Sequence, residues 1–407
     1  MNADAIPVTI LSGSLGAGKT TLLNHLLHNA GDLDIAVLVN DMGEINIDAA
    51  LVSDNSELSV ADGGVTELSN GCICCELQDD LNEAVVRLAQ NRDFDHLVVE
   101  SSGISEPEPV ARLFTTESRA AALYTVDSLV TVVDSRLFFD AFGGEGIPER
   151  RDTDDADTRP LSDLLIEQVE FSNLVVLNKT DLVTDEELET VAELVRALRP
   201  DAELRYTSHG ALDPHELLGQ HLYNPQTAAD AAGWKQALAA DDEHDHSHGH
   251  SHHDHAHPEA VYGVSSFTFR ARRPFHPTRI AALLGDLPRG IIRSKGACWA
   301  AGCGDNKLVF GQAGPSARIE VSGPWIASLS ELDQELYKAN RPNLDWDDEW
   351  GDRRTELVFI GTDLQEATVR ENLEACLLTN EEMAADWDAF ENPLPTELGD
   401  LVVLAEP

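Results

Sequence analysis

Short apolar runs rich in β-branched residues alternate with helical patterns through the first half of the chain. The apolar runs occupy residues 8–11, 35–40, 97–100, 129–134 and 174–178. Helical periodicity separates several of them, at residues 20–28, 81–90 and 185–197. Strands that are apolar throughout and alternate with helices are typical of a parallel sheet covered by helices on both faces. The pattern therefore predicts an α/β domain over residues 1–225.

A change in composition divides the chain after this region. Residues 241–257 hold eight of the fifteen histidines and almost no apolar side chain, which predicts a disordered linker over residues 226–260. Strand patterns return at residues 261–270, 307–321 and 356–361, and helical patterns at residues 277–284 and 364–378. We expect a smaller α+β domain over residues 261–378, then an acidic tail over residues 379–407. A Gly/Asp/Arg-rich stretch at residues 143–159 indicates a surface insertion.

The charge balance limits the partners that the chain can attract. Lys and Arg number 28 against 73 Asp and Glu, a formal charge of −45. Nucleic acids and anionic membranes attract a positive field, so we expect the chain to bind neither. A folded protein this acidic is typical of a salt-rich cytoplasm, where ions screen the self-repulsion. With no secretory signal and no run of 18 apolar residues, we expect a cytoplasmic protein that does not span a membrane.

A glycine-rich phosphate-binding loop follows the first apolar run. It has the full GxxxxGK[ST] pattern: Gly13, Ser14, Leu15, Gly16, Ala17, Gly18, Lys19 and Thr20. In a strand–loop–helix setting, such a loop turns its backbone N–H groups toward phosphates, and the helix N-terminus adds positive charge. We expect Lys19 to reach the β- and γ-phosphates, Thr20 to ligate Mg²⁺, and Thr21 to join the phosphate site. The alternative, a glycine-rich turn that binds nothing, is disfavoured by the Lys19-Thr20 pair.

A second nucleotide motif, Asn-Lys-Thr-Asp, begins at Asn178 at the end of an apolar run. The Asp181 carboxylate can accept paired hydrogen bonds from guanine N1–H and N2–H₂, which adenine does not offer in that arrangement. With Asn178 and Lys179, it predicts GTP rather than ATP. The alternative is a turn followed by a helix cap. Residues 207–210 are a weaker candidate for further contacts to the base.

Two acidic residues are candidates for catalysis beside Lys19. Glu100 ends an apolar strand, where this class of NTPase carries an acid that positions Mg²⁺ or water; a helix-capping or solvated carboxylate is the alternative. Glu44 lies in residues 40–44, which follow the second apolar run. We interpret this stretch as a switch loop that senses the Mg²⁺ and γ-phosphate.

Three cysteines, Cys72, Cys74 and Cys75, lie within four residues. Their spacing does not suit a self-contained tetrahedral zinc finger, so they indicate an open metal site with outside ligands. Inert buried cysteines and a redox pair are the alternatives. The histidine-rich tract favours borderline metals such as Zn²⁺, Ni²⁺ or Co²⁺. Whether Cys298 and Cys303 form a second metal site or are structural stays open.

These motifs together resemble the CobW-like family of metal-handling P-loop GTPases. The matching stretches are GSLGAGKTTLLNHLL, NDMGEINID, ELSNGCICC, VVESSG and NKTD, with RSKG and RTELVFIG in the second domain. The resemblance implies a P-loop NTPase fold, binding of GTP·Mg²⁺, slow hydrolysis, and Zn²⁺ or Co²⁺ held by Cys72, Cys74 and Cys75. Ser14 and Asp41 depart from the family's usual residues, but neither removes a phosphate contact.

We therefore expect a GTP-dependent metallochaperone that passes its metal to a client metalloprotein. One alternative is a non-enzymatic metal buffer built on the histidine-rich tract, although intact Lys19, Thr20 and Asp181 argue against it. The other is an assembly GTPase that serves one cobalt-dependent enzyme or cobalamin synthesis. A homodimer also stays open.

Overall fold

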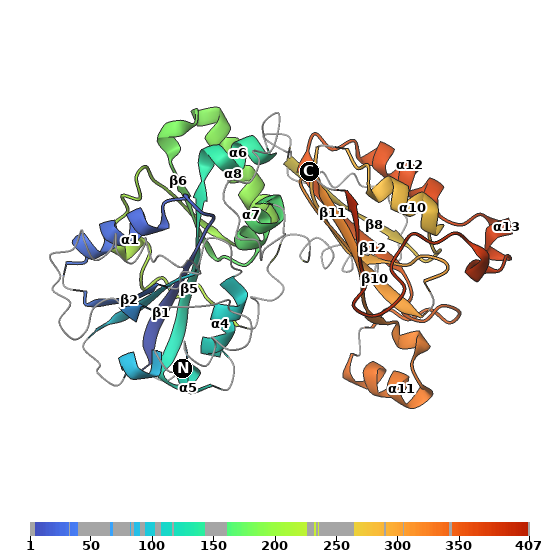
Figure 1. Cartoon of the computed structure of the whole chain (residues 1–407), viewed down its shortest axis with the longest axis horizontal. Helices are drawn as coiled ribbons and strands as arrows, with labels where there is room; N and C mark the ends of the chain where they lie inside the picture. Colours follow the sequence, from blue (N-terminus) through green and yellow to red (C-terminus); the bar gives the residue numbers. More distant parts are fainter. Residues whose placement is uncertain are drawn as a thin grey trace, which may run out of the picture. The chain divides into compact units, whose positions relative to one another are not determined.

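The chain folds into two units, Met1–Gly233 and Trp234–Pro407 (Figure 1). The computed structural model describes residues 5–31, 33–39, 66–67, 82, 85–89, 94–101, 107–115, 118–142, 161–225, 232, 235, 264–288, 290–303, 305–341 and 344–405. The expected surface insertion at residues 143–159 lies outside these residues. So does the expected linker at residues 226–260, apart from residues 232 and 235.

The first unit is built on a sheet of seven parallel strands in the order β3-β2-β4-β1-β5-β6-β7. The central strands are almost entirely buried, as their unbroken apolar patterns predict. The strands are β1 (Ile6–Ser12), β2 (Ile35–Val39), β3 (Thr66–Glu67), β4 (His96–Glu100), β5 (Tyr124–Asp134), β6 (Leu174–Asn178) and β7 (Glu203–Tyr206).

Helices cover both faces of this sheet, and Figure 1 shows α1 and α4 on opposite sides of β1 and β5. Leu22, Leu23 and Leu26 of α1 pack on one face, whereas Val110 and Phe114 of α4 pack on the other. The helical segments are α1 (Lys19–His28), α4 (Pro107–Thr115), α5 (Arg119–Leu123), α6 (Ser135–Phe142), α7 (Leu161–Glu170), α8 (Asp185–Leu198) and the 3₁₀ turns η1 (Thr180–Leu182) and η2 (Pro214–Glu216).

Local sequence sets where these helices begin. Thr184 and Glu187 form a capping box at the start of α8: each side chain accepts a hydrogen bond from the other residue's backbone N–H. Gly18 precedes α1 with φ 102°, so the helix starts directly from the glycine-rich loop. The loop and the helix N-terminus therefore form one continuous element at the carboxyl end of β1.

The second unit has a six-stranded sheet in the order β13-β11-β10-β9-β12-β8, with every pairing antiparallel. Its strands are β8 (Val264–Ala271), β9 (Ile291–Cys298), β10 (Asn306–Ala313), β11 (Ser316–Pro324), β12 (Thr355–Thr362) and β13 (Leu401–Ala405). Its helical segments are α10 (Pro277–Leu284), α11 (Glu331–Asn340), α12 (Glu366–Cys376), α13 (Asn380–Met383) and the 3₁₀ turns η4 (Ile326–Ser328) and η5 (Trp387–Ala389).

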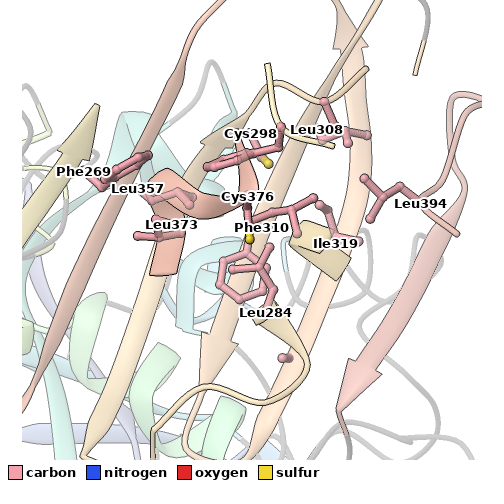
Figure 2. Packing of buried hydrophobic residues seen from close by; sticks show 14 of the residues in the cluster. Phe269, Leu284, Cys298, Leu308, Phe310, Ile319, Leu357, Leu373, Cys376 and Leu394 are labelled. Atoms are coloured by element: carbon pink, nitrogen blue, oxygen red, sulfur yellow. The ribbon is translucent and has the colours of Figure 1, made fainter. Parts of the chain in front are cut away.

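One face of the second sheet carries the core of this unit. Figure 2 shows Phe310, Leu357 and Ile319 from the strands packed with Leu284 of α10 and Leu373 of α12. Stacked rings extend this core, because Phe267 and Phe359 lie opposite each other on β8 and β12 with centroids 5.0 Å apart. The core gives the second unit its own source of stability.

The predicted fold class, a parallel α/β sheet followed by a smaller α+β domain, is confirmed. Residues 379–407, expected as an acidic tail, contain α13 and also β13, which pairs with β11. The apolar run Leu401-Val402-Val403-Leu404 explains this return to the sheet, since Val402 and Leu404 pack on its core. Among the described residues, none of the helices has the length and apolar character needed to cross a membrane.

Candidate nucleotide and metal site

The glycine-rich loop lies at the carboxyl edge of the sheet, between the end of β1 and the start of α1. Its backbone requires glycine: Gly13, Gly16 and Gly18 have φ of 140°, 77° and 102°. A Cβ at Gly13 would lie 2.3 Å from the carbonyl oxygen of Val132, and one at Gly18 would lie 2.4 Å from Nδ2 of Asn178. The loop is therefore pressed against the neighbouring strands β5 and β6.

The loop and the start of α1 have the donor chemistry that phosphates need. The Lys19 ammonium donates to the carbonyl oxygens of Gly13, at 2.7 Å, and Ser14, at 3.3 Å, so it lies against the loop. The Ser14 hydroxyl is buried and has no hydrogen-bond partner among the described residues. No side-chain hydrogen bond caps the start of α1, because Gly18 at this position has no side chain, and an uncapped helix N-terminus of this kind suits an anion. These residues fit a nucleotide polyphosphate.

Asn178 joins the two nucleotide motifs. Its side-chain N–H donates to the carbonyl oxygen of Ala17 over 2.8 Å, and its Oδ1 accepts the backbone N–H of Gly210 over 3.1 Å. The Ser135 hydroxyl donates to the Asn178 carbonyl oxygen over 2.7 Å. Hydrogen bonds of Asn178 therefore connect the glycine-rich loop, the 207–210 loop and the end of β6.

The rest of the Asn-Lys-Thr-Asp motif turns sharply after β6. Lys179 has φ 59°, in the left-handed region, and its ammonium donates to Asp134 Oδ2 over 2.7 Å. The Thr180 hydroxyl lies 2.9 Å from that of Ser208, which ties this turn to the 207–210 loop. The Asp181 carboxylate is accessible at 40% and lies 3.9 Å from Nε2 of His209. An accessible carboxylate at this position can accept hydrogen bonds from a base.

Glu100 lies at the end of β4, in register with Leu11 of β1. It is buried, and the next residue, Ser101, donates both its N–H and its hydroxyl to the carbonyl oxygen of Leu11. The acid that the sequence singles out therefore belongs to the strand beside the phosphate loop.

The metal-site candidates Cys72, Cys74 and Cys75 lie outside the described residues, and so do Glu44 and the histidine-rich tract. The strand before the cysteines, β3, is described: it ends at Glu67 and pairs in parallel with β2. Because all strands of this sheet run in one direction, β3 ends at the same edge as β1. The cysteines therefore follow a strand that leads toward the edge of the phosphate loop.

The second cysteine pair belongs to the core of the C-terminal unit. Cys298 and Cys303 are buried, and Figure 2 shows Cys298 and Cys376 among apolar side chains. Burial raises the pKa of Cys298 and raises the pKa of Cys303 to about 11, so both thiols are held in the neutral form. Among the described residues, no group of three or more His, Cys, Asp or Glu side chains is arranged to hold a metal ion. Cys298 and Cys303 thus pack as small apolar residues.

Two residues that bond to the Asn-Lys-Thr-Asp motif, Asp134 and Ser135, were not predicted from the sequence. Both follow the apolar run of β5 and bond to the Asn-Lys-Thr-Asp motif. A signal was present, since an Asp-Ser pair at a strand end often caps the following helix. The pattern alone did not indicate that this strand end lies beside Asn178.

Comparison with known proteins agrees with the motifs. Residues 7–205 match the family described as CobW/HypB/UreG, nucleotide-binding domain, and residues 264–377 match the cobalamin synthesis protein cobW C-terminal domain. A relative from Dictyostelium discoideum, named zinc-regulated GTPase metalloprotein activator 1, is 37% identical over 411 residues, which cover 95% of this chain and 83% of the relative. The chain belongs to the CobW family. The predicted family resemblance is confirmed.

Two further CobW-family relatives are bacterial. The zinc chaperone CobW of Pseudomonas aeruginosa is 39% identical over 225 residues, which cover 53% of this chain and 60% of the relative. The zinc chaperone YjiA of Escherichia coli is 26% identical over 376 residues, which cover 90% of this chain and 96% of the relative. The chain is thus related along nearly its whole length to proteins named as GTPases or zinc chaperones.

Proposed function

We propose that this CobW-family chain is a GTPase that carries Zn²⁺ and couples GTP hydrolysis to delivery of the metal to a client metalloprotein. One observation carries the proposal: Asn178 hydrogen-bonds the Asn-Lys-Thr-Asp motif to the phosphate loop at the carboxyl edge of the sheet. The strand before the cysteines, β3, ends at this same edge. The names of the relatives support GTP as the nucleotide and zinc as the cargo.

The nucleotide is held by two sets of residues. The phosphates lie on the loop from Gly13 to Thr21, with Lys19 moving from its loop carbonyls to the β- and γ-phosphates. The guanine lies between Lys179 and the 207–210 loop, where the Asp181 carboxylate accepts its N1–H and N2–H₂ groups. Base and phosphates are thereby read by loops that Asn178 keeps in register.

Hydrolysis depends on charge stabilisation and on a positioned water. Thr20 would hold Mg²⁺, which when bound would supply positive charge to stabilise the charge that develops on the phosphates. Lys19 adds a second positive charge. Glu100, which is buried on the adjacent strand β4, orients the water that attacks the γ-phosphate. Glu44, in the switch loop at residues 40–44, assists in orienting this water.

The zinc site is the thiolate group Cys72, Cys74 and Cys75. Three strand spacings separate β3 from β1, about 14 Å across the sheet. Cys72 follows Glu67 by five residues, which span up to about 17 Å when extended, so the chain length allows the thiolates to approach the phosphate loop. A switch loop ordered by GTP then supplies the missing ligands, and hydrolysis removes them. Co²⁺ is the second choice of metal.

The nucleotide part of this proposal is tested with Asp181→Asn. The wild-type chain is expected to hydrolyse GTP in preference to ATP. An asparagine amide instead donates to the 2-oxo group of xanthine, so the variant is expected to lose GTP turnover and gain XTP turnover. Equal turnover of GTP and ATP by the wild type, or an unchanged preference in the variant, would contradict guanine recognition. Phosphate release, measured with each nucleotide, gives the answer.

A further inference from the structure

Asp134 forms an ion pair with the lysine of the guanine motif. Its Oδ2 accepts the Lys179 ammonium over 2.7 Å, and both side chains are largely covered, with 14% and 32% of their surfaces exposed. Asp134 ends β5 and lies in register with Asn178, the residue before Lys179, on β6. Sheet pairing therefore sets the separation between the carboxylate and the lysine.

The Asp134 carboxylate is itself fixed by α6. Its Oδ1 accepts the backbone N–H groups of Arg136 and Leu137, each at 3.1 Å, at the start of that helix. Arg136 in turn donates to Glu187 of α8 over 2.9 Å. With one oxygen held by a helix start and the other facing Lys179, the carboxylate has a defined direction.

We propose that Asp134 is a positioning residue for the guanine base, in that it holds Lys179 against the site before nucleotide binds. The inference rests on the proposed function as a guanine-nucleotide enzyme. A lysine side chain loses much conformational freedom when it is fixed against a ligand. An ion pair already present in the free protein moves that entropy cost from binding to folding, which raises nucleotide affinity.

Asp134→Asn separates this role from simple helix capping. Asparagine caps a helix about as well as aspartate, so the bonds to Arg136 and Leu137 are retained, whereas the charge that attracts Lys179 is lost. The matched control is Asp140→Asn. Asp140 pairs with Arg136 on the same helix, and its hydrogen bonds among the described residues are to Arg136. Both substitutions change the net charge by the same amount.

The experiment measures GDP and GTP-analogue Kd, together with KM and kcat, for the wild type and both variants. Asp134→Asn is expected to raise Kd and KM about fivefold to tenfold and to leave kcat within about twofold, as expected for lost ground-state binding. Asp140→Asn is expected to leave Kd within about twofold. Equal Kd values for wild type and Asp134→Asn would overturn the inference alone, whereas a wild type that binds no guanine nucleotide would overturn the proposed function as well.

A double-mutant cycle with Lys179→Met shows whether Asp134 acts through Lys179. In the Lys179→Met background, Asp134→Asn is expected to change Kd by less than about twofold, because the pair is already broken. If Asp134→Asn weakens binding as strongly in that background as in the wild type, Asp134 acts by another route and the positioning role is refuted.

Discussion

The side chain of Asn178 donates to the carbonyl oxygen of Ala17, a residue 161 positions earlier in the chain. Its other amide atom accepts from Gly210. One buried side chain thereby connects the end of β6, the glycine-rich loop and the 207–210 loop, so the proposed phosphate and base sites are linked by hydrogen bonds. A substitution of Asn178 should therefore weaken binding of both the phosphates and the base.

Asn178→Ala is expected to weaken both GTP and GDP binding and to destabilise the first unit. Loss of two buried hydrogen bonds, with their partners left unpaired, should cost about 2–4 kcal/mol of unfolding free energy. Titration calorimetry with each nucleotide and urea unfolding measure the two effects. Asn29→Ala is the control, because the bonds of exposed Asn29 among the described residues are to its own helix, and it should change stability by less than about 1 kcal/mol. If Asn178→Ala binds both nucleotides as tightly as the wild type, Asn178 does not connect the phosphate and base sites.

Substitution of the phosphate-loop glycines by alanine should lower the free energy of unfolding by different amounts. At Gly13, a Cβ would collide with the Val132 carbonyl, so Gly13→Ala is expected to cost more than about 3 kcal/mol. At Gly16, no described atom lies within 4 Å, so only the φ of 77° is strained and the cost should be about 1 kcal/mol.

Gly31→Ala is the control for this pair, because Gly31 has φ 64°, equally open surroundings and a position outside the loop. It should match Gly16→Ala in stability while leaving GTP affinity unchanged. Urea unfolding and GTP titration measure both quantities. A Gly13→Ala variant no more destabilised than Gly31→Ala would contradict the close packing of Gly13 against Val132.

A buried polar group lies within the first unit, away from the phosphate loop. The Asp127 carboxylate accepts the backbone N–H groups of Gly219, Gln220 and His221, and Nε2 of His96 lies 3.9 Å from it. Burial lowers the pKa of His96 from its ordinary value, with the Asp127 charge opposing and the nearby His221 adding to the shift. His96 is thus held neutral in the folded protein.

The free energy of unfolding should therefore fall as pH decreases below about 6.5, because His96 binds a proton in the unfolded chain at a higher pH than in the folded protein. The contribution is complete above the ordinary pKa and is lost as pH falls toward the lowered folded pKa, with a slope of up to about 1.4 kcal/mol per pH unit. Urea unfolding across this window should show a shallower slope for His96→Gln than for the wild type. Parallel profiles would contradict the assignment.

Sequence patterns predicted most of the parallel sheet because its strands are apolar without interruption, as in β6, whose predicted bounds match the observed ones. The first half of β5 was missed, since Asp127 and Ser128 break its apolar run, and their burial depends on partners far along the chain. The motif residues of the candidate nucleotide site could be proposed from the sequence because phosphate and base chemistry restricts residue types. Asp134 was not found because its role depends on the register between β5 and β6.

Zinc binding should depend on the cysteine group at residues 72–75 and not on Cys298 and Cys303. Replacing Cys72, Cys74 and Cys75 by serine is expected to remove one tightly bound zinc per chain, because thiolates supply most of the affinity. Cys303→Ala is the control, since Cys303 is buried and its thiol is held neutral. Metal analysis of anaerobically purified protein measures the stoichiometry. Loss of zinc from Cys303→Ala, or full zinc in the triple variant, would contradict the site.

Coupling between nucleotide and metal binding is what makes the proposed protein a GTP-dependent zinc carrier, and the zinc affinity of the nucleotide-bound chain measures this coupling. Competition with a chelator gives the zinc Kd of the chain loaded with a non-hydrolysable GTP analogue and, separately, with GDP. A variant lacking residues 241–257 serves in parallel, so that the histidine-rich tract does not mask the thiolate site. We expect at least about tenfold tighter zinc binding with the GTP analogue than with GDP, and an equal effect of zinc on nucleotide affinity. The same zinc Kd with both nucleotides would contradict this coupling.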